Sequence, residues 1–392
     1  MSALRPPQAV PNAPCAVAAG IAVAIAQALV RADPDGTRIL VARVSRSGRI
    51  ADLARMPGRS ARPAPSFRRS HRARKALILT CHGFCPKTGT THHHHKPQPQ
   101  AELGMTMNRT VHVNGDYLPE ADATVSIFDR GFLMADGVYE VTSVLDGKLI
   151  DFDGHCARLG RSLAELDMAA PCSDADLLVI FRELVRLNDI TDGMVYLQVT
   201  RGNPGDRDFA YPPADTRPTL VAFTQNKPGL ADAPVAKVGW KVISVPDERW
   251  GRRDIKTTQL LYPSMAKMMA KAAKVDDSWF VQDGHVTEGT SNNAYIVKGN
   301  RIITRQLSHD LLHGITRAAV LRLAAEAQME VEERAFTIAE AQAADEAFVT
   351  SASAFVMPVV QIDGVDLRDG KPGAVTARMR EIYIDEMRKT AI

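Results

Sequence analysis

Lys256 is the residue of this chain whose surroundings most directly suggest chemistry. It lies in "RRDIKTTQLL", residues 251–260, between an isoleucine and two threonines, where the residue types are typical of the edge of a folded core. A lysine amine is a nucleophile only when it is deprotonated, and partial desolvation by Ile255, Thr257 and neighbouring sheet residues favours that neutral form. The local pattern alone leaves the role of Lys256 open, because a surface lysine at the end of a strand would fit it equally well.

Two other segments could bind an anion. Residues 314–316, "GIT", stand at the expected start of a helix, where backbone N–H groups are free and the helix dipole favours negative charge. Residues 351–353, "SAS", form an expected turn that can add amides and two hydroxyls, although Ala352 can contribute only its backbone. Gly-x-Thr before a helix is a common cap, so neither segment indicates a site by itself.

The first group of elements that must position these residues covers residues 107–226. Residues 137–152 are typical of two strands joined by Asp146-Gly147, a strong hairpin signal. Asp153 is the expected cap of a following helix, and Ser173-x-x-Asp176 is a capping box that opens a second one. Apolar residues at helical spacing predict the buried faces of these helices: Leu159, Leu163 and Leu166, then Leu177, Ile180, Phe181, Leu184 and Leu187.

The second group covers residues 235–392, after a Pro- and Gly-containing linker at 227–234. Residues 235–245 are strand-like, and the Ala, Met and Leu content of residues 259–275 favours a helix that tolerates Pro263 in its first turn. Residues 278–297 alternate as a hairpin, and residues 346–360 predict two strands around the "SAS" turn. The fold class is therefore α+β, with two domains, each a sheet or barrel-like sheet flanked by helices.

The first 106 residues differ in composition from the rest. They hold 16 Lys and Arg against 4 Asp and Glu, whereas residues 107–392 hold 32 against 41, so the net charge of +3 averages two unlike parts. The segment is rich in Arg, Pro and Ala without a sustained period, which is typical of a disordered, basic extension. We expect the natural protein to start at Met105 or Met107.

Several functions of the extension stay open beside a solvated tail. Residues 6–30 carry no charge and resemble a secretory signal, but their alanine content and Pro14 disfavour a membrane span. The cluster of Cys81, His82, Cys85 and residues 92–95 fits no standard zinc spacing, and the basic run 55–75 has one aromatic residue for stacking. We expect no metal site, no nucleic-acid binding and no membrane association.

Cysteine content indicates a reducing compartment. Five cysteines in 392 residues are few, and only Cys156 and Cys172 fall in the part expected to fold, where both are predicted to be buried thiols. We therefore expect a cytoplasmic protein.

Seven short motifs, taken together, resemble one family. "DGVYEV", "ARL", "VTRG", "DIK", "VTEGTSNN", "GITR" and "VTSAS" occur in the order and at roughly the separations of class IV pyridoxal-phosphate aminotransferases, the fold-type IV enzymes. The resemblance covers residues 107 to about 385, and D-amino-acid transaminase is the most similar type. It implies pyridoxal 5′-phosphate (PLP) as cofactor, bound by the domain at 235–392.

The resemblance assigns the chemistry to two residues. Lys256 matches the catalytic lysine that forms a Schiff base with the cofactor aldehyde and later moves a proton. Glu288 matches the acid that keeps the pyridine nitrogen protonated, so that the ring can accept electrons. The resemblance also implies that Arg158 is the arginine that binds the cofactor phosphate. The other residues that it implies as cofactor-binding are Ser291, Asn292, Ile315, Thr316, Ser351 and Ala352.

Substrate binding departs from the family pattern at one position. Tyr139 matches a carboxylate-binding tyrosine, and Arg207 matches the arginine of a loop that reaches the neighbouring subunit's site in a homodimer. That loop reads "RDFAYP" here, with Phe209 where the family has histidine, so one donor is missing. Tyr196 is a candidate for the pocket or for the core, and Glu140 could sit behind Lys256 as a supporting partner.

The resemblance implies transamination between a D-amino acid, such as D-alanine or D-glutamate, and a 2-oxo acid. Branched-chain amino acid transaminase and (R)-amine transaminase remain alternatives within the family, as does a lyase similar to aminodeoxychorismate lyase. A non-enzymatic role of residues 1–106 in nucleic-acid or metal binding is the alternative outside it.

Overall fold

The computed structural model describes residues 28–32, 38–42 and 109–392. The predicted cysteine and histidine cluster and the basic run 55–75 lie outside these residues. Within the segment expected to be disordered, two short strands are described, and they pair antiparallel: β1 (Ala28–Ala32) and β2 (Arg38–Ala42). Residues 109–392 belong to a single compact unit.

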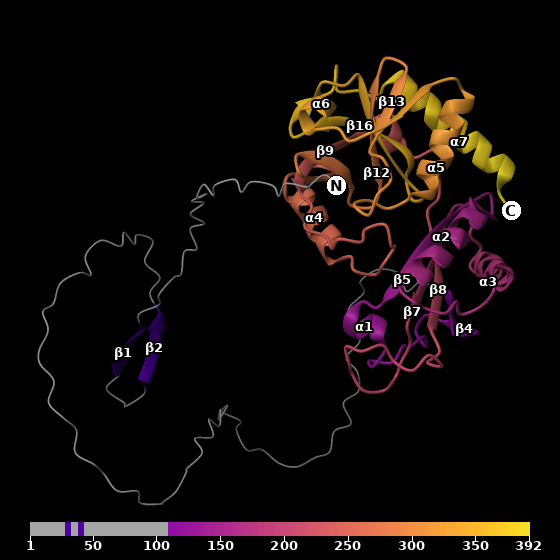
Figure 1. Cartoon of the computed structure of the whole chain (residues 1–392), viewed down its shortest axis with the longest axis vertical. Coiled ribbons are helices and arrows are strands. Elements are labelled where there is room, and N and C mark those ends of the chain that lie inside the picture. Colours follow the sequence, from indigo (N-terminus) through magenta and orange to yellow (C-terminus); the bar gives the residue numbers. More distant parts are fainter. Residues whose placement is uncertain (1–27, 33–37, 43–108) are drawn as a thin grey trace, which may run out of the picture. The chain divides into compact units, whose positions relative to one another are not determined.

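A six-stranded antiparallel sheet begins this unit, in the order β4-β3-β8-β7-β5-β6. Its strands are β3 (Thr110–Val113), β4 (Asp116–Pro119), β5 (Gly137–Leu145), β6 (Lys148–Leu149), β7 (Gly193–Thr200) and β8 (Thr219–Asn226). The helices of this region are α1 (Arg130–Met134), α2 (Phe152–Glu165) and α3 (Asp174–Leu187), drawn in magenta in Figure 1.

The side chains of β5 point alternately to the two faces of the sheet, and the two faces have different surroundings. Val138 and Val144 pack in one core with Leu159 of α2 and Leu184 of α3. Because successive side chains of a strand point to opposite faces, Tyr139 and the other odd-numbered residues of β5 face away from these helices. That second face is the one available to a site.

The predicted turns and caps of this region are largely confirmed. Asp146 and Gly147 adopt positive φ values of 51° and 76° between the paired residues Leu145 and Lys148, as a two-residue hairpin turn requires. Ser173 and Asp176 form the capping box of α3.

Three details of the prediction were wrong. Asp151, in a left-handed conformation, is the N-cap residue of α2, and Asp153 lies in its first turn, where its charge suits the helix dipole. Leu187 is 37% exposed because it is the last residue of α3, beyond the part of the helix that packs on the sheet. Cys172 is only partly buried, whereas Cys156 is buried as expected.

A nine-stranded mixed sheet follows, in the order β11-β10-β9-β16-β15-β12-β13-β14, with β17 paired to β16. Its strands are β9 (Trp240–Pro246), β10 (Asp277–Gln282), β11 (His285–Gly289), β12 (Asn293–Lys298), β13 (Arg301–Thr304), β14 (Glu330–Glu333), β15 (Glu346–Ser351), β16 (Phe355–Ile362) and β17 (Val365–Asp366). The strand expected from residue 235 begins at Trp240, because Pro234–Lys237 forms a 3₁₀ turn, η1.

Four helices accompany this sheet. They are α4 (Leu261–Ala272), α5 (Ile315–Glu326), α6 (Ile338–Gln342) and α7 (Ala374–Thr390). Figure 1 shows α5 and α7 side by side, and both contribute to one core with β12, β15 and β16. Pro263 lies in the first turn of α4, as predicted, where its missing N–H has no helical partner to lose.

The segment that carries Lys256 is paired to the first sheet. Tyr139 N donates to the Lys256 carbonyl at 3.0 Å, Thr258 N donates to the Gly137 carbonyl at 3.0 Å, and Val138 and Thr257 form an antiparallel bridge. Lys256 is therefore fixed against β5, although it follows the predicted linker in sequence. The boundary at residues 227–234 stays a prediction. In the part of the chain that the structure describes, no helix combines the length and the apolar character needed to cross a membrane.

Candidate active site

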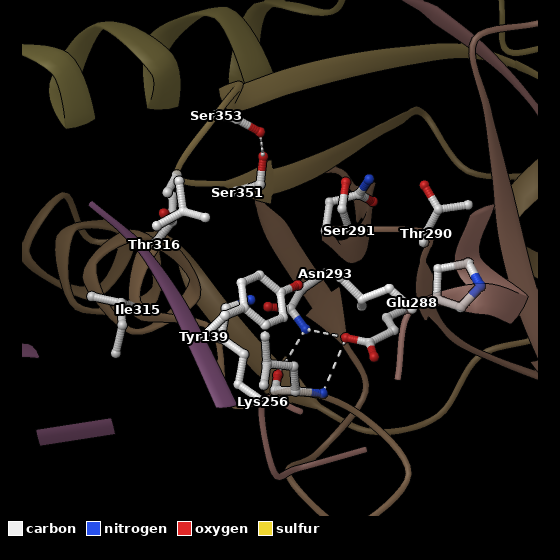
Figure 2. Close-up of a pocket in the computed structure, with 18 of the residues that line it drawn as sticks. Tyr139, Lys256, Glu288, Thr290, Ser291, Asn293, Ile315, Thr316, Ser351 and Ser353 are labelled. Atoms are coloured by element: carbon white, nitrogen blue, oxygen red, sulfur yellow. Dashed lines mark hydrogen bonds between the residues drawn. The ribbon is translucent and has the colours of Figure 1, made fainter. Parts of the chain in front are cut away.

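A cavity of about 510 Å³ brings the predicted residues together. Strand β5 supplies Tyr139, the 251–257 segment supplies Lys256, and β11 with the turn that follows it supplies Glu288 and Ser291. Figure 2 shows these side chains around the cavity, together with Ile315, Thr316 and Ser351. The cavity thus combines elements from both sheets, and its lining holds an amine, a carboxylate and a group of hydrogen-bond donors.

Lys256 lies over the ring of Tyr139. Its Nζ is 4.1 Å from the ring centroid, a cation–π distance, and the side chain is half-buried. The backbone N–H of Lys256 donates to Ser162 Oγ of α2 at 3.4 Å. These contacts orient the amine towards the cavity. The backbone pairing with β5 holds the main chain of Lys256 in place.

Glu288 is buried and accepts three hydrogen bonds. Arg249 Nη1 donates to Oε1 at 2.5 Å, whereas Asn293 Nδ2 and the backbone N–H of Leu312 both donate to Oε2 at 3.1 Å. Burial raises the pKa of Glu288, and Arg249 acts in the opposite direction. Since a carboxylate has about four lone-pair sites, Glu288 can accept one further hydrogen bond from a group in the cavity.

Glu140 lies elsewhere than predicted. Its carboxylate accepts from Arg158 Nε at 2.8 Å and Nη2 at 2.7 Å, and it contacts His155 Nδ1 at 2.8 Å. It belongs to the even-numbered face of β5, so it meets α2 instead of Lys256. Burial alone would raise the pKa of Glu140, but Arg158 and His155 outweigh it and hold this pKa below its ordinary value.

Arg158 is buried at the cavity wall. Besides its two bonds to Glu140, it donates from Nη1 to the His313 carbonyl at 3.1 Å, next to the start of α5. Because Glu140 fixes the plane of the guanidinium, the position of its cavity-facing edge is set by the fold.

The anion-binding donors gather at the N-terminus of α5 and at the β15–β16 turn. Ile315 and Thr316 begin α5 and line the cavity, and the N-cap residue Gly314 makes no side-chain cap bond. A Cβ at Gly314 would collide with Asn293 Oδ1, so this close approach requires glycine.

The β15–β16 turn adds two hydroxyls. Ser351 and Ser353 line the cavity with their oxygens 3.4 Å apart, and the Ala352 carbonyl accepts from Ser143 Oγ at 2.5 Å. Ala352 itself also lines the cavity. The turn is therefore supported by β5 while its hydroxyls face the cavity, as Figure 2 shows for Ser351 and Ser353.

The side chains of Asn292 and Asn293 donate hydrogen bonds to different acceptors. The Asn292 side chain lines the cavity, but its Nδ2 donates to Asp277 at 2.7 Å and its Oδ1 is buried without a hydrogen-bond partner among the described residues. Asn293, which the motif contained but the prediction passed over, is the residue that donates to Glu288.

Tyr196 supports Tyr139 from behind. The two rings stack at 5.7 Å, the Tyr196 ring also stacks on Phe223 at 4.8 Å, and its hydroxyl donates to Gln198. Tyr196 is not among the described residues that line the cavity. Burial raises its pKa to about 12, which keeps the hydroxyl neutral.

Arg207 lies outside this chain's own cavity. It is exposed and stacks on Phe209, with its Cζ 4.7 Å from the ring centroid. The arginines that do line the cavity, Arg158, Arg249 and Arg253, are each paired with a carboxylate of the same chain.

Sequence reasoning missed four residues of the cavity that carry a basic side chain, namely His155, Lys227, Arg249 and Arg253. His155 precedes Arg158 by three residues, so helical spacing could have placed it on the same face of α2. Arg249 pairs with Asp247 and Glu288, and no local pattern in the sequence signals that contact.

The comparisons agree with this geometry. Residues 137–362 match the family Amino-transferase class IV. The D-alanine aminotransferase of Bacillus licheniformis is 40% identical over 267 residues, which cover 68% of this chain and 93% of that protein. This chain belongs to the class IV aminotransferases.

Further class IV relatives include the D-alanine aminotransferase of Staphylococcus epidermidis. It is 34% identical over 273 residues, 69% of this chain and 95% of that protein. Two branched-chain amino acid aminotransferase structures share the fold. The Escherichia coli enzyme has a TM-score of 0.65 at 21% identity, covering 71% of this chain and 95% of that one. The Thermoproteus uzoniensis enzyme with norvaline has a TM-score of 0.62 at 24% identity, covering 70% and 93%.

Class IV aminotransferases depend on PLP, and the cavity residues fit this group. A phosphate requires donors and positive charge, and the cavity lining offers Arg158, the first residues of α5 and the β15–β16 turn for this purpose. Glu288 has acceptor capacity that a protonated ring nitrogen could use, and the amine of Lys256 could meet the aldehyde.

Proposed function

We propose that this protein transfers the amino group of a D-amino acid, such as D-alanine or D-glutamate, to a 2-oxo acid. The observation that carries the proposal is the meeting of Lys256, Glu288 and Tyr139 in one cavity of a chain 40% identical to a D-alanine aminotransferase. The branched-chain enzymes support the fold alone, because their identity is 21% and 24%.

Three groups of the chain divide the work in this proposal. Lys256 Nζ is the amine that would hold the cofactor aldehyde, and it would accept the proton from the substrate α-carbon and return it. Glu288 holds a proton at the ring nitrogen, with Arg249 and Asn293 fixing its carboxylate. Arg158 and Thr316 hold the phosphate, together with Ile315, Ser351 and the Ala352 backbone. When bound, PLP takes up the electron pair released at the α-carbon and carries the amino group between the two half-reactions.

We further propose that the protein acts as a homodimer. Each arginine that lines the cavity among the described residues already has a carboxylate partner in the same chain, so we assign the substrate carboxylate to an arginine of the neighbouring subunit. Arg207 is exposed on a loop next to α1, since Arg130 donates to the Asp208 and Ala210 carbonyls. From this position it would reach the cavity of the neighbouring subunit, where Tyr139 supplies the second donor.

Exposed apolar side chains support the same assembly. Around α1 and the 203–213 loop they are Ile127, Phe128, Phe132, Phe209 and Tyr211, and on α4 they are Leu261, Met265, Met268 and Met269. Apolar groups gathered in this way mark association surfaces. We assign them to the dimer interface.

We place the enzyme in the cytoplasm, where thiols stay reduced. Cys156 and Cys172 are free thiols, and burial raises the pKa of Cys156 to about 12, so this thiol stays protonated and unreactive.

The decisive experiment measures binding and turnover in the same preparation. Purified protein is mixed with PLP, reduced with borohydride and digested, and D-alanine, L-leucine and a chiral arylalkylamine are compared as donors. We expect a borohydride-fixed label on Lys256 and the fastest turnover with D-alanine. Lys256→Ala should lose both, whereas Lys271→Ala, at an exposed position on α4, should keep both.

Other outcomes identify the alternatives. Faster turnover of L-leucine or of the arylalkylamine would assign one of the other transaminase activities. Formation of pyruvate without any amino acceptor would point to a lyase. A wild-type protein that acquires no label at Lys256 would refute the enzyme assignment.

A further inference from the structure

Arg380 is a buried guanidinium that forms no ion pair with any carboxylate in the part of the chain that the structure describes. It lies on the inner face of α7, is 8% exposed, and does not line the cavity. Its two terminal nitrogens donate to four backbone carbonyls, those of Ala354, Val356, Leu230 and Ala231. Among the described residues no acid forms an ion pair with it, so the four carbonyls and the more distant charge of Asp232 offset the loss of its hydration.

One nitrogen of Arg380 fixes an unusual piece of backbone. Nη1 donates to the Ala354 carbonyl at 2.9 Å and to the Val356 carbonyl at 2.7 Å, so the two oxygens are at most about 5.6 Å apart. In a regular strand, equivalent groups two residues apart are separated by about 6.6–6.8 Å. The approach is possible because the intervening Phe355 has a φ of 58°.

Phe355 is a costly residue for that conformation. A bulky side chain in the left-handed region is a rare backbone state that the surrounding structure must impose. Here the ring is completely buried, packs on Tyr383 of α7 at 5.5 Å, and lies 5.9 Å from Arg380 Cζ. Helix α7 therefore holds both the backbone and the side chain of Phe355.

The strained residue is directly connected to the cavity. Ser353 lies two residues before Phe355, and the turn of residues 351–353 presents its hydroxyls to the cavity. On the other side of this turn, Ser143 Oγ donates to the Ala352 carbonyl. The turn is thus held between β5 and Arg380, and Arg380 ties it also to Leu230 and Ala231 of the predicted linker.

We propose that Arg380 is a positioning residue that sets the 351–353 turn for a phosphate monoester, by holding the carbonyls on both sides of Phe355. This inference rests on the proposed function, because it takes the phosphate to be that of the bound cofactor. Hydrogen bonds weaken steeply with distance and angle, so a turn that relaxes by about 1 Å loses its contacts to the phosphate. The contacts made by Lys256 and Glu288 do not depend on this turn.

The test compares two aldehydes that differ only in the phosphate. Affinities of the apo protein for PLP and for pyridoxal are measured by absorbance titration in wild type and in Arg380→Lys, whose single ammonium cannot bridge four carbonyls. We expect PLP to bind about tenfold more weakly or worse, and pyridoxal to change by less than about twofold. Arg378→Lys, the same change at an exposed position of α7, should leave both affinities unchanged.

The ratio of the two affinities decides between positioning and general support. Equal weakening of both aldehydes, or no weakening of PLP, would overturn the proposal. If Arg380→Lys does not fold, as judged by urea unfolding, Arg380→Gln is measured instead, since its amide retains two donors, and the same ratio decides. If the wild type binds neither aldehyde, the proposed function is refuted as well. If the wild type binds both aldehydes and the variant has the same ratio of PLP affinity to pyridoxal affinity as the wild type, this inference alone is refuted.

Discussion

Glu140 and Arg158 face each other as a buried bidentate pair, with Nε 2.8 Å from Oε1 and Nη2 2.7 Å from Oε2. Glu140 comes from β5 and Arg158 from α2, so the pair fastens the helix to the strand directly behind the cavity. It also fixes the orientation of the cation that we assign to the phosphate.

Replacing Glu140 by Gln should destabilise the protein strongly. The change leaves Arg158 charged, buried and without an anionic partner, and breaking a buried pair in this way costs about 3 kcal/mol or more. The free energy of unfolding of the apo protein, measured in urea, should fall by that amount. Glu183→Gln, which removes the partner of the exposed Arg186, should change it little. A stable Glu140→Gln variant would show that the pair contributes little.

The same carboxylate should make the stability depend on acid pH. Arg158 and His155 hold the pKa of Glu140 below its ordinary value of 4.5, despite burial. A carboxylate whose pKa is lower in the folded than in the unfolded protein stabilises the fold while it is ionised. This stabilisation is fully present above about pH 4.5 and is lost as the pH falls through the pKa of the folded state. Urea unfolding should therefore show a stability gap between wild type and Glu140→Gln that is constant near neutral pH and narrows in acid. A gap that widens on acidification would contradict this pKa shift.

Glu288→Gln should reduce turnover more than cofactor binding. The neutral amide cannot hold a proton at the ring nitrogen, and the loss of one such electrostatic contact lowers kcat on the order of 10²-fold. The affinity for PLP, which depends mainly on the phosphate and on Lys256, should change by less than about tenfold. Stopped-flow rates of the D-alanine half-reaction test the first effect. Glu326→Gln, at an exposed site on α5, is the control, and a variant with wild-type turnover would remove Glu288 from the proposed chemistry.

The two stacked tyrosines should behave differently when each loses its hydroxyl. Tyr139 lines the cavity, so Tyr139→Phe should raise KM for D-alanine about tenfold through one lost hydrogen bond to a carboxylate, with the ring over Lys256 preserved. The Tyr196 hydroxyl donates to Gln198 outside the cavity, so Tyr196→Phe should leave KM within about twofold. Steady-state kinetics at saturating acceptor decide this, and equal effects of both changes would contradict the assignment of Tyr139.

A charge at Phe132 should dissociate the proposed dimer. Phe132 is 73% exposed next to the loop that carries Arg207, and an aspartate there would have to be buried at the interface without a partner. Light scattering after gel filtration should show a monomer, and D-alanine turnover should fall with it. Val179→Asp places the same charge at an apolar residue that is 66% exposed on α3, and it should stay dimeric. Dissociation of both variants, or of neither, would disprove the assigned surface.

Much of this architecture could be predicted from local sequence. The Asp146-Gly147 turn, the Ser173 capping box and the start of α5 after Gly314 depend on neighbours within a few residues, so their residue types suffice. Lys256 and Glu288 could be proposed as site residues because each lies in a short motif of the family. Arg249, which donates to the Glu288 carboxylate, lies in no such motif.

The tertiary structure alone decided which groups meet. By alternation Glu140 could be placed on the face of β5 opposite Tyr139, but only the packing of α2 on that face shows that Arg158 and His155 are its partners. Arg380 is one of several arginines near the C-terminus, and its role emerges only from carbonyls about 25 and 150 residues away in the chain. Local order follows from short-range sterics and hydrogen bonding, whereas long-range contacts depend on how whole elements pack, which no single segment encodes.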